Sequence, residues 1–328
     1  MIRVRRAGLL TTVQDLGRRG MQQHGVSRGG AMDTVAHRIA NLLVGNAEGA
    51  AALECTLLGP ALEFVEERVV ALGGGDLGAT LDGRAVPLWS PFVAPAGGVL
   101  SFSGPRTGCR ACVAVAGGID VPPVLGSRAT DLTAAIGGHE GRAIAAGDEL
   151  PTGAPGPAAG RMRDRLLAAP DDAPRVGRSL IPHYSARPVV RVIRGPEHDR
   201  FSAVSRELLL AGEFEVTPQS NRMGLRLTGP SLSLSGLYDL YSSPVTMGTV
   251  QVPPSGEPIV LMADHQTIGG YPRIASVITV DLPLLAQAPP GARVRFREVS
   301  LADAQTLYLR QEHDLRLFAA GLRVHHTA

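Results

Sequence analysis

The 328-residue chain carries a net charge of +2, and only 4% of its residues are aromatic. It has no basic run and few aromatic side chains to stack on bases, so nucleic-acid binding has no support. No apolar stretch approaches the roughly 18 residues of a membrane span. All 32 basic residues are arginine, so the chain has no P-loop lysine, no Schiff-base lysine and no lysine to carry biotin.

Glycine (40) and proline (25) punctuate many short apolar runs, a pattern typical of a mostly β protein with a few short helices. We predict strands at Arg3–Arg5, Leu62–Phe64, Val69–Gly73, Val99–Ser103, Cys112–Ala116, Val189–Ile193, Glu213–Thr217, Ile259–Ala263, Val277–Asp281 and Arg293–Glu298. We predict helices at Ala31–Val44, Asp164–Ala169, Phe201–Leu210, Leu282–Gln287 and Leu301–Phe318.

The three cysteines include a C-x-x-C pair, Cys109 and Cys112. A structural zinc site needs four ligands, and no second C-x-x-C or H-x-x-x-H follows, so we predict core packing and no metal site. The odd, low cysteine count and the lack of an apolar leader after Met1 favour a cytoplasmic protein.

Composition shifts between residues 151 and 188, where prolines and glycines gather and β-branched residues are few. We therefore expect a first β domain at residues 1–150, a linker or surface excursion at 151–188, a second β domain at 189–300, and a C-terminal helix and tail at 301–328.

The two halves share faint internal similarity. The run at Ile2 (IRVRR) matches the run at Val190 (VRVIR), and Arg18 and Gly20 stand at the same offset as Arg222 and Gly224. We interpret this as two similar β domains in tandem, closed as barrels to avoid exposed strand edges.

Three segments carry candidate functional residues. The first, between Gln14 and Asp33, interleaves glycines with Gln14, Asp15 and Arg18, and suits either an anion site or a set of polar turns. The second is the DHQTIGGYP segment, Asp264–Pro272. The third, around Asn221, holds Arg222, a candidate for contact with an anion.

The DHQTIGGYP segment follows an apolar strand, a common way to place polar groups on a rigid scaffold. Asp264 could act as a general base or orient His265, His265 could relay a proton, and Gln266 could donate to a developing oxyanion. The alternative is that Asp264 and Gln266 only tie down the loop backbone.

Several long motifs together resemble the family known as allophanate hydrolase subunit 2, as biotin-dependent carboxyltransferase or as the C-subunit of 5-oxoprolinase. They are Thr12–Gly20 (TVQDLGRRG), Gly29–Asp33 (GGAMD), Asn41–Asn46 (NLLVGN), Asn221–Gly224 (NRMG), Gly248–Val252 (GTVQV) and DHQTIGGYP. The sequence departs from the family pattern at Cys112, commonly an aromatic, and at Ile268, commonly a threonine.

This resemblance implies two cyclophilin-like β-barrel domains in tandem. It also implies a companion protein similar to the B-subunit of 5-oxoprolinase or to allophanate hydrolase subunit 1. A third, LamB/YcsF-type protein joins in free-standing bacterial versions, whose complex uses ATP. From the chemistry of the side chains in these motifs, we predict a catalytic group of Asp264, His265 and Gln266. The predicted contacts to a small-molecule substrate are Gln14, Asp15, Arg18, Arg222, Gln251, Gly269, Gly270 and Tyr271.

The leading interpretation is a subunit of an ATP-dependent 5-oxoprolinase, a hydrolase that opens 5-oxoproline to glutamate and is inactive without its partners. Arg18 or Arg222 would bind the substrate carboxylate. One alternative is the carboxyltransferase subunit of a biotin-dependent urea or amide carboxylase, with biotin on a partner. Another is a non-enzymatic regulator that antagonises a kinase inhibitor.

Overall fold

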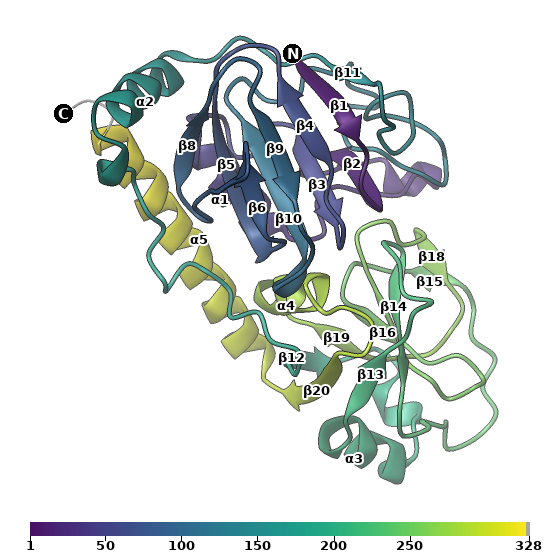
Figure 1. The fold of residues 1–328 in the computed structure, drawn as a ribbon. Coiled ribbons are helices and arrows are strands. Elements are labelled where there is room, and N and C mark those ends of the chain that lie inside the picture. Colours follow the sequence, from purple (N-terminus) through teal and green to yellow (C-terminus); the bar gives the residue numbers. More distant parts are fainter. Residues whose placement is uncertain (326–328) are drawn as a thin grey trace. The chain divides into compact units, whose positions relative to one another are not determined.

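The computed structural model describes residues 1–325, and the predicted tail at 326–328 lies outside them. Inter-residue contacts divide the chain into two compact units (Figure 1). The first comprises Met1–Arg18, Gly29–Pro182 and the chain from His313, and the second comprises Arg19–Arg28 and His183–Glu312. Each unit therefore includes a segment from a distant part of the sequence, and the linear domain boundaries stay a prediction.

The first unit consists of two packed antiparallel sheets. One has the order β11 (Glu149–Leu150), β1 (Ile2–Arg6), β4 (Ala61–Phe64), β9 (Val99–Phe102), β6 (Ala79–Leu81) and β7 (Arg84–Ala85). The other has the order β2 (Leu10–Gln14), β3 (Ala52–Thr56), β10 (Thr107–Val115), β5 (Arg68–Asp76) and β8 (Pro91–Ala94).

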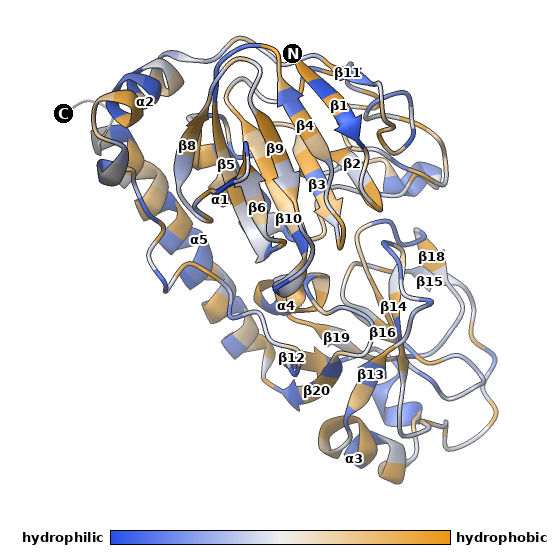
Figure 2. Cartoon of the chain, viewed as in Figure 1, coloured by the Kyte–Doolittle hydropathy of each residue, from blue (hydrophilic) through white to orange (hydrophobic). Residues whose placement is uncertain are grey.

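The core of the first unit is largely aliphatic, in keeping with the low aromatic content of the chain. Leu62, Phe64 and Leu100 of the first sheet pack with Leu53 and Val113 of the second, all fully buried. Figure 2 shows the matching hydrophobic colouring along these strands. All three cysteines are free and buried. Burial raises the pKa of the Cys55 thiol to about 12. Cys109 and Cys112 are buried as well, as the predicted packing role requires.

Helix α1 (Thr34–Leu43) packs on strands β5 and β10. Asp33 caps it by accepting a hydrogen bond from the Ala36 N–H at 2.9 Å, and so the helix begins later than predicted. Gly73 permits this approach, because a Cβ there would lie 2.7 Å from the Ala36 carbonyl oxygen. Helix α2 (Pro157–Ala168) also belongs to this unit.

The second unit is built on a closed seven-stranded barrel. Its order is β12 (Val189–Arg194), β19 (Arg273–Val277), β16 (Thr249–Gln251), β17 (Ile259–Leu261), β14 (Gly224–Thr228), β13 (Phe214–Val216) and β20 (Arg293–Glu298). A parallel pairing of β12 with β20 closes it, and the other pairings are antiparallel. A separate two-stranded ribbon joins β15 (Ser243–Pro244) to β18 (Ile268–Gly269).

Helices α3 (Ala203–Ala211) and α4 (Leu282–Ala286) belong to the second unit, and α5 (Leu301–His325) begins there. Short 3-10 turns occur at Gln22–His24, Pro170–Asp172, His198–Arg200 and Thr279–Asp281. The mostly β fold class with a few helices is confirmed. Across residues 1–325, no helix combines the length and the apolar composition that crossing a bilayer requires.

One predicted strand, Val277–Asp281, is wrong. The strand ends at Val277, and Thr279–Asp281 forms a 3-10 turn that leads into α4. The β-branched run favours a strand, but the Asp281 carboxylate accepts hydrogen bonds from the backbone N–H and the guanidinium of Arg191 at 2.5–2.9 Å. These bonds and Pro283 at the start of α4 set a turn instead.

Candidate functional site

The DHQTIGGYP loop is anchored at its start by a buried ion pair. Asp264 follows β17, and its N–H donates to the Arg222 carbonyl at 2.9 Å. The Arg222 guanidinium donates from Nε and Nη2 to the two carboxylate oxygens of Asp264 at 2.8 and 2.9 Å. Both residues are buried. This two-pronged geometry fixes the loop to the start of β14.

His265 is held in one orientation by the next residue. Its Nδ1 lies 2.5 Å from the Gln266 carbonyl oxygen. Because a carbonyl can only accept, Nδ1 carries the proton, and the neutral ring presents Nε2 as a lone pair. Burial lowers the pKa of His265 below its usual 6.5, and the charge of Arg28 lowers it further. The imidazole is therefore a neutral base at neutral pH.

Two side-chain amides converge beside Gly269. Gln251, the last residue of β16, is buried, and its Oε1 accepts a hydrogen bond from Gln266 Nε2 at 3.4 Å. A Cβ added to Gly269 would lie 2.4 Å from Gln251 Nε2 and 3.4 Å from Gln266 Nε2. Gln251 Nε2 itself has no hydrogen-bond partner in the described part of the chain. The structure thus places a spare buried donor under the loop.

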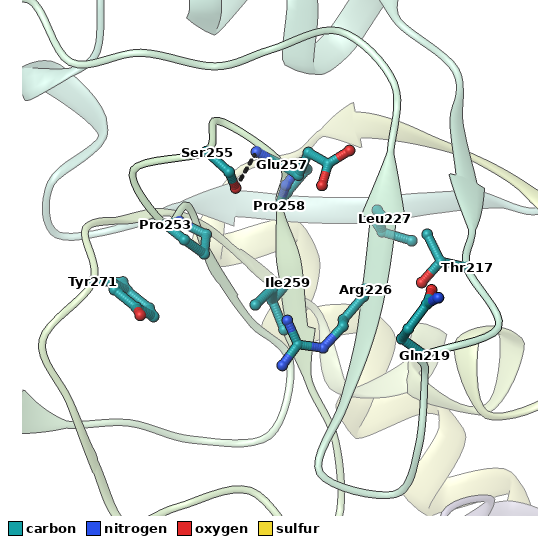
Figure 3. Close-up of a pocket in the computed structure, with 10 residues that line it drawn as sticks. All are labelled: Thr217, Gln219, Arg226, Leu227, Pro253, Ser255, Glu257, Pro258, Ile259 and Tyr271. Atoms are coloured by element: carbon teal, nitrogen blue, oxygen red, sulfur yellow. Dashed lines mark hydrogen bonds between the residues drawn. The ribbon is translucent and has the colours of Figure 1, made fainter.

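The strand pairing shows which further residues share the outer face of the barrel with Gln251. Arg226 of β14 and Gln251 of β16 both pair with Ile259 of β17. Directly paired residues point to the same face of a sheet, and Leu225 and Leu227 point the other way, into the core. Tyr271 of the loop joins Arg226 and Ile259 in lining a pocket of about 330 Å³ (Figure 3).

A segment of the first glycine-rich motif belongs to the same unit as this loop. The chain leaves the first unit after Arg18, contributes Arg19–Arg28 to the second unit, and returns to the first unit at Gly29. A Cβ on Gly30 would lie 2.7 Å from the Gly17 N, so glycine lets the two ends of this excursion come together. Burial and the nearby charge of Arg19 lower the pKa of the Arg28 guanidinium. The excursion therefore places positive charge near His265.

Comparison with known proteins identifies the family. Residues 24–298 match the family model described as "Carboxyltransferase domain, subdomain A and B". The chain belongs to this family. It is 43% identical to the C-subunit of 5-oxoprolinase from Escherichia coli over 99% of both chains. It is 38% identical to the C-subunit of 5-oxoprolinase from Haemophilus influenzae over 92% of both chains.

A solved structure extends the similarity to a larger enzyme. The carboxyltransferase-domain chain superposes on the K. lactis urea amidolyase with a TM-score of 0.87 and 30% identity. The match covers 97% of this chain but only 20% of the urea amidolyase chain. The family resemblance seen in the motifs is confirmed, and the similarity to urea amidolyase concerns one part of a much longer protein.

Three predicted site residues of this carboxyltransferase-domain chain lie together in its first unit. The Asp15 carboxylate accepts hydrogen bonds from the Ser127 hydroxyl and the Arg128 N–H at 2.7 and 2.6 Å. The fully buried Arg18 donates to the Ala129 carbonyl, and Gln14 Nε2 donates to the Thr130 carbonyl at 3.2 Å. All three side chains hold the segment at residues 127–130.

The other predicted residues belong to the second unit, where the structure brings together Asp264 with Arg222 and Gln251 with Gln266 and Gly269. Tyr271 lines the pocket, while Gly270 approaches the Ser242 hydroxyl. The sequence prediction did not select Arg28 or Arg226. Arg226 can be recognised as a candidate only from its pairing with Ile259, which requires the strand register to be known. Within residues 1–325, no three His, Cys, Asp or Glu side chains form a metal-binding group.

Substitution of Gly269 by alanine tests the role of the Gln251 and Gln266 side-chain amides. Gly269→Ala is expected to displace the buried Gln251 amide and to reduce activity at least 10-fold, because its Cβ would stand 2.4 Å from Gln251 Nε2. Gly236→Ala is the control, since Gly236 is outside the predicted site and its Cβ would meet only a ring carbon of Tyr238 at 3.9 Å. The measurement is kcat for the activity proposed below, with the companion proteins present. Equal kcat values for the wild type and Gly269→Ala would contradict a role of Gln251 in the reaction.

Proposed function

We propose that this chain is a subunit of an ATP-dependent 5-oxoprolinase, which opens the ring of 5-oxoproline to give L-glutamate. The observation that carries the proposal is the 43% identity, over essentially the whole chain, to a protein named as the C-subunit of 5-oxoprolinase. The geometry supports it, because a neutral imidazole and two amide groups suit hydrolysis of a small lactam.

Each group has a role in lactam opening. A water oxygen bonds to the ring carbonyl carbon, and His265 Nε2 takes a proton from that water. Gln251 and Gln266 donate hydrogen bonds to the carbonyl oxygen as it becomes negative. The ring C–N bond then breaks, and the leaving nitrogen takes the proton that His265 Nε2 received from the water, which returns the imidazole to its neutral form. In this proposal Asp264 keeps a catalytic contribution by positioning, through Arg222, the loop that carries His265 and Gln266.

ATP is assigned to a partner. Opening a lactam to an amino acid is uphill without activation, and this chain has no lysine and therefore no P-loop. We propose a companion similar to the B-subunit of 5-oxoprolinase together with a LamB/YcsF-type protein, and we expect this chain to be inactive alone. A cytoplasmic location belongs to the same proposal.

Reconstitution tests the proposal directly. The chain, its two partners, ATP and 5-oxoproline are mixed, and release of L-glutamate is measured with and without this chain. Glutamate should appear only when all components are present. Equal release without this chain would overturn the proposal.

The second candidate is a carboxyltransferase component of a biotin-dependent carboxylase, favoured by the matched family model and the similarity to urea amidolyase. The chain has no lysine to carry biotin, so a biotinylated partner would have to bring the carboxyl group. Transfer of label from bicarbonate to urea or another amide, in the presence of that partner, would favour this function over the first.

A further inference from the structure

The substrate carboxylate needs a cation, and the two arginines that the sequence points to are both occupied. Arg18 is fully buried and donates to the Ala129 carbonyl. Arg222 is 4% exposed, and its guanidinium holds Asp264 with two hydrogen bonds. Because both side chains are buried, neither guanidinium group can donate hydrogen bonds to a ligand that arrives from solvent. The cation that binds the carboxylate is therefore expected among the other arginines of the second unit.

Several arginines of the barrel are occupied by ion pairs: Arg191, Arg194 and Arg273 pair with Asp281, Glu298 and Glu197. Arg226 lines the pocket and is not among them. The Arg226 side chain makes neither an ion pair nor a hydrogen bond with any described residue, although its backbone bonds to Thr217 and Ser220. Figure 3 shows its guanidinium extending along the pocket toward Ile259 and Tyr271.

The same pocket contains a buried hydroxyl that lacks a partner. Thr217 lines the pocket, and its Oγ1 is inaccessible and makes no hydrogen bond within the described residues. Leaving such a group unsatisfied costs about 1–3 kcal/mol, so it calls for an explanation such as a bound ligand or water. At about 330 Å³ the pocket is at the small end of the range for small-molecule sites.

The charges in the pocket narrow the ligand class. One arginine matches one carboxylate, and Glu257 on the same pocket wall disfavours a second negative charge on the ligand. Glu257 accepts a hydrogen bond from the Thr228 hydroxyl at 2.8 Å and can also accept an N–H from a ligand. Tyr271 offers a flat face to a small ring. A phosphate or a dicarboxylate fits these groups less well.

We propose that the pocket formed by Arg226, Thr217, Glu257 and Tyr271 binds a small monocarboxylate that carries an N–H donor, with the carboxylate on Arg226. Its identification with 5-oxoproline rests on the proposed function. The shared partner Ile259 places Arg226 and Gln251 on one face of the barrel. A ligand held by Arg226 therefore lies on the same face as the spare amide donor of the reaction site, with Ile259 of β17 between the two side chains.

Binding to the full chain tests the proposal without the reaction. NMR titrations use 5-oxoproline and 2-pyrrolidinone, the same lactam without a carboxylate, on the wild-type chain and on the chain with its companion protein. 5-Oxoproline should bind and 2-pyrrolidinone should bind at least 10-fold more weakly. Arg226→Ala should weaken 5-oxoproline binding about 10- to 100-fold, the range for a lost hydrogen bond to a charged group.

Arg295→Ala is the control, because Arg295 is an exposed arginine on β20 of the same barrel, and it should bind as the wild type does. Equal affinity of wild type and Arg226→Ala, equal affinity for the two lactams, or no 5-oxoproline binding in either preparation would overturn the pocket assignment. Failure of the proposed function looks different: carboxylate binding would still depend on Arg226, but the reconstituted complex would release no glutamate.

Discussion

Asp264→Asn is expected to lower the free energy of unfolding by about 3–5 kcal/mol, the range for removing one partner of a buried ion pair. The substitution leaves the Arg222 guanidinium in a site where it is 4% exposed, facing a neutral amide in place of a carboxylate. Urea denaturation of the isolated chain, followed by circular dichroism, measures the loss. Arg222→Met should be destabilising for the same reason, since it strands the Asp264 carboxylate.

A double-mutant cycle measures the interaction energy between Asp264 and Arg222 apart from their other contacts. The variant Asp264→Asn with Arg222→Met should be less destabilised than the sum of the two single replacements, because neither charge is then left buried alone. The exposed pair Arg194–Glu298, with side chains 62% and 34% accessible, is the control. Glu298→Gln should cost less than about 1 kcal/mol. Equal losses at the two sites would contradict the anchoring role of Asp264.

Part of this site follows from the sequence. The internal match of Arg18 with Arg222 pairs two arginines that the structure buries, although the sequence proposed them as contacts to an anion. The strand before DHQTIGGYP was also predicted correctly. Such features follow from local patterns, because an apolar run and the glycines after it act over a few residues.

The partners of these groups could not be predicted. Arg222 meets a carboxylate 42 positions later in the chain, and nothing near Arg222 distinguishes Asp264 from the other acids. Strand β16 has only three residues, too few for a periodic pattern to reveal it. The alternation of Leu225, Arg226 and Leu227 in β14 is a strand signal that the prediction missed. The assignment of Arg19–Arg28 to the second unit depends on tertiary contacts, which no local signal encodes.

His265→Asn is expected to lower kcat of the reconstituted complex by about 10²- to 10⁴-fold, the range for loss of a general base. The asparagine amide can replace Nδ1 as the donor to the Gln266 carbonyl, which His265 contacts at 2.5 Å, so the loop should keep its conformation. Only Nε2 is lost. His198→Asn is the control, because His198 is another buried histidine of this unit, with its Nδ1 3.1 Å from Asp199 Oδ1. It should retain wild-type kcat.

The pH dependence of kcat distinguishes a base from a merely structural histidine. Burial lowers the pKa of His265, so the reactive neutral form persists below pH 6.5, and the acid limb of the kcat profile should lie below that value. Arg28 is one cause of the lowering, and so Arg28→Gln should move the limb toward higher pH. His265→Asn should remove the limb altogether. A limb that survives this substitution would belong to another group, and His265 would then serve only to orient the loop.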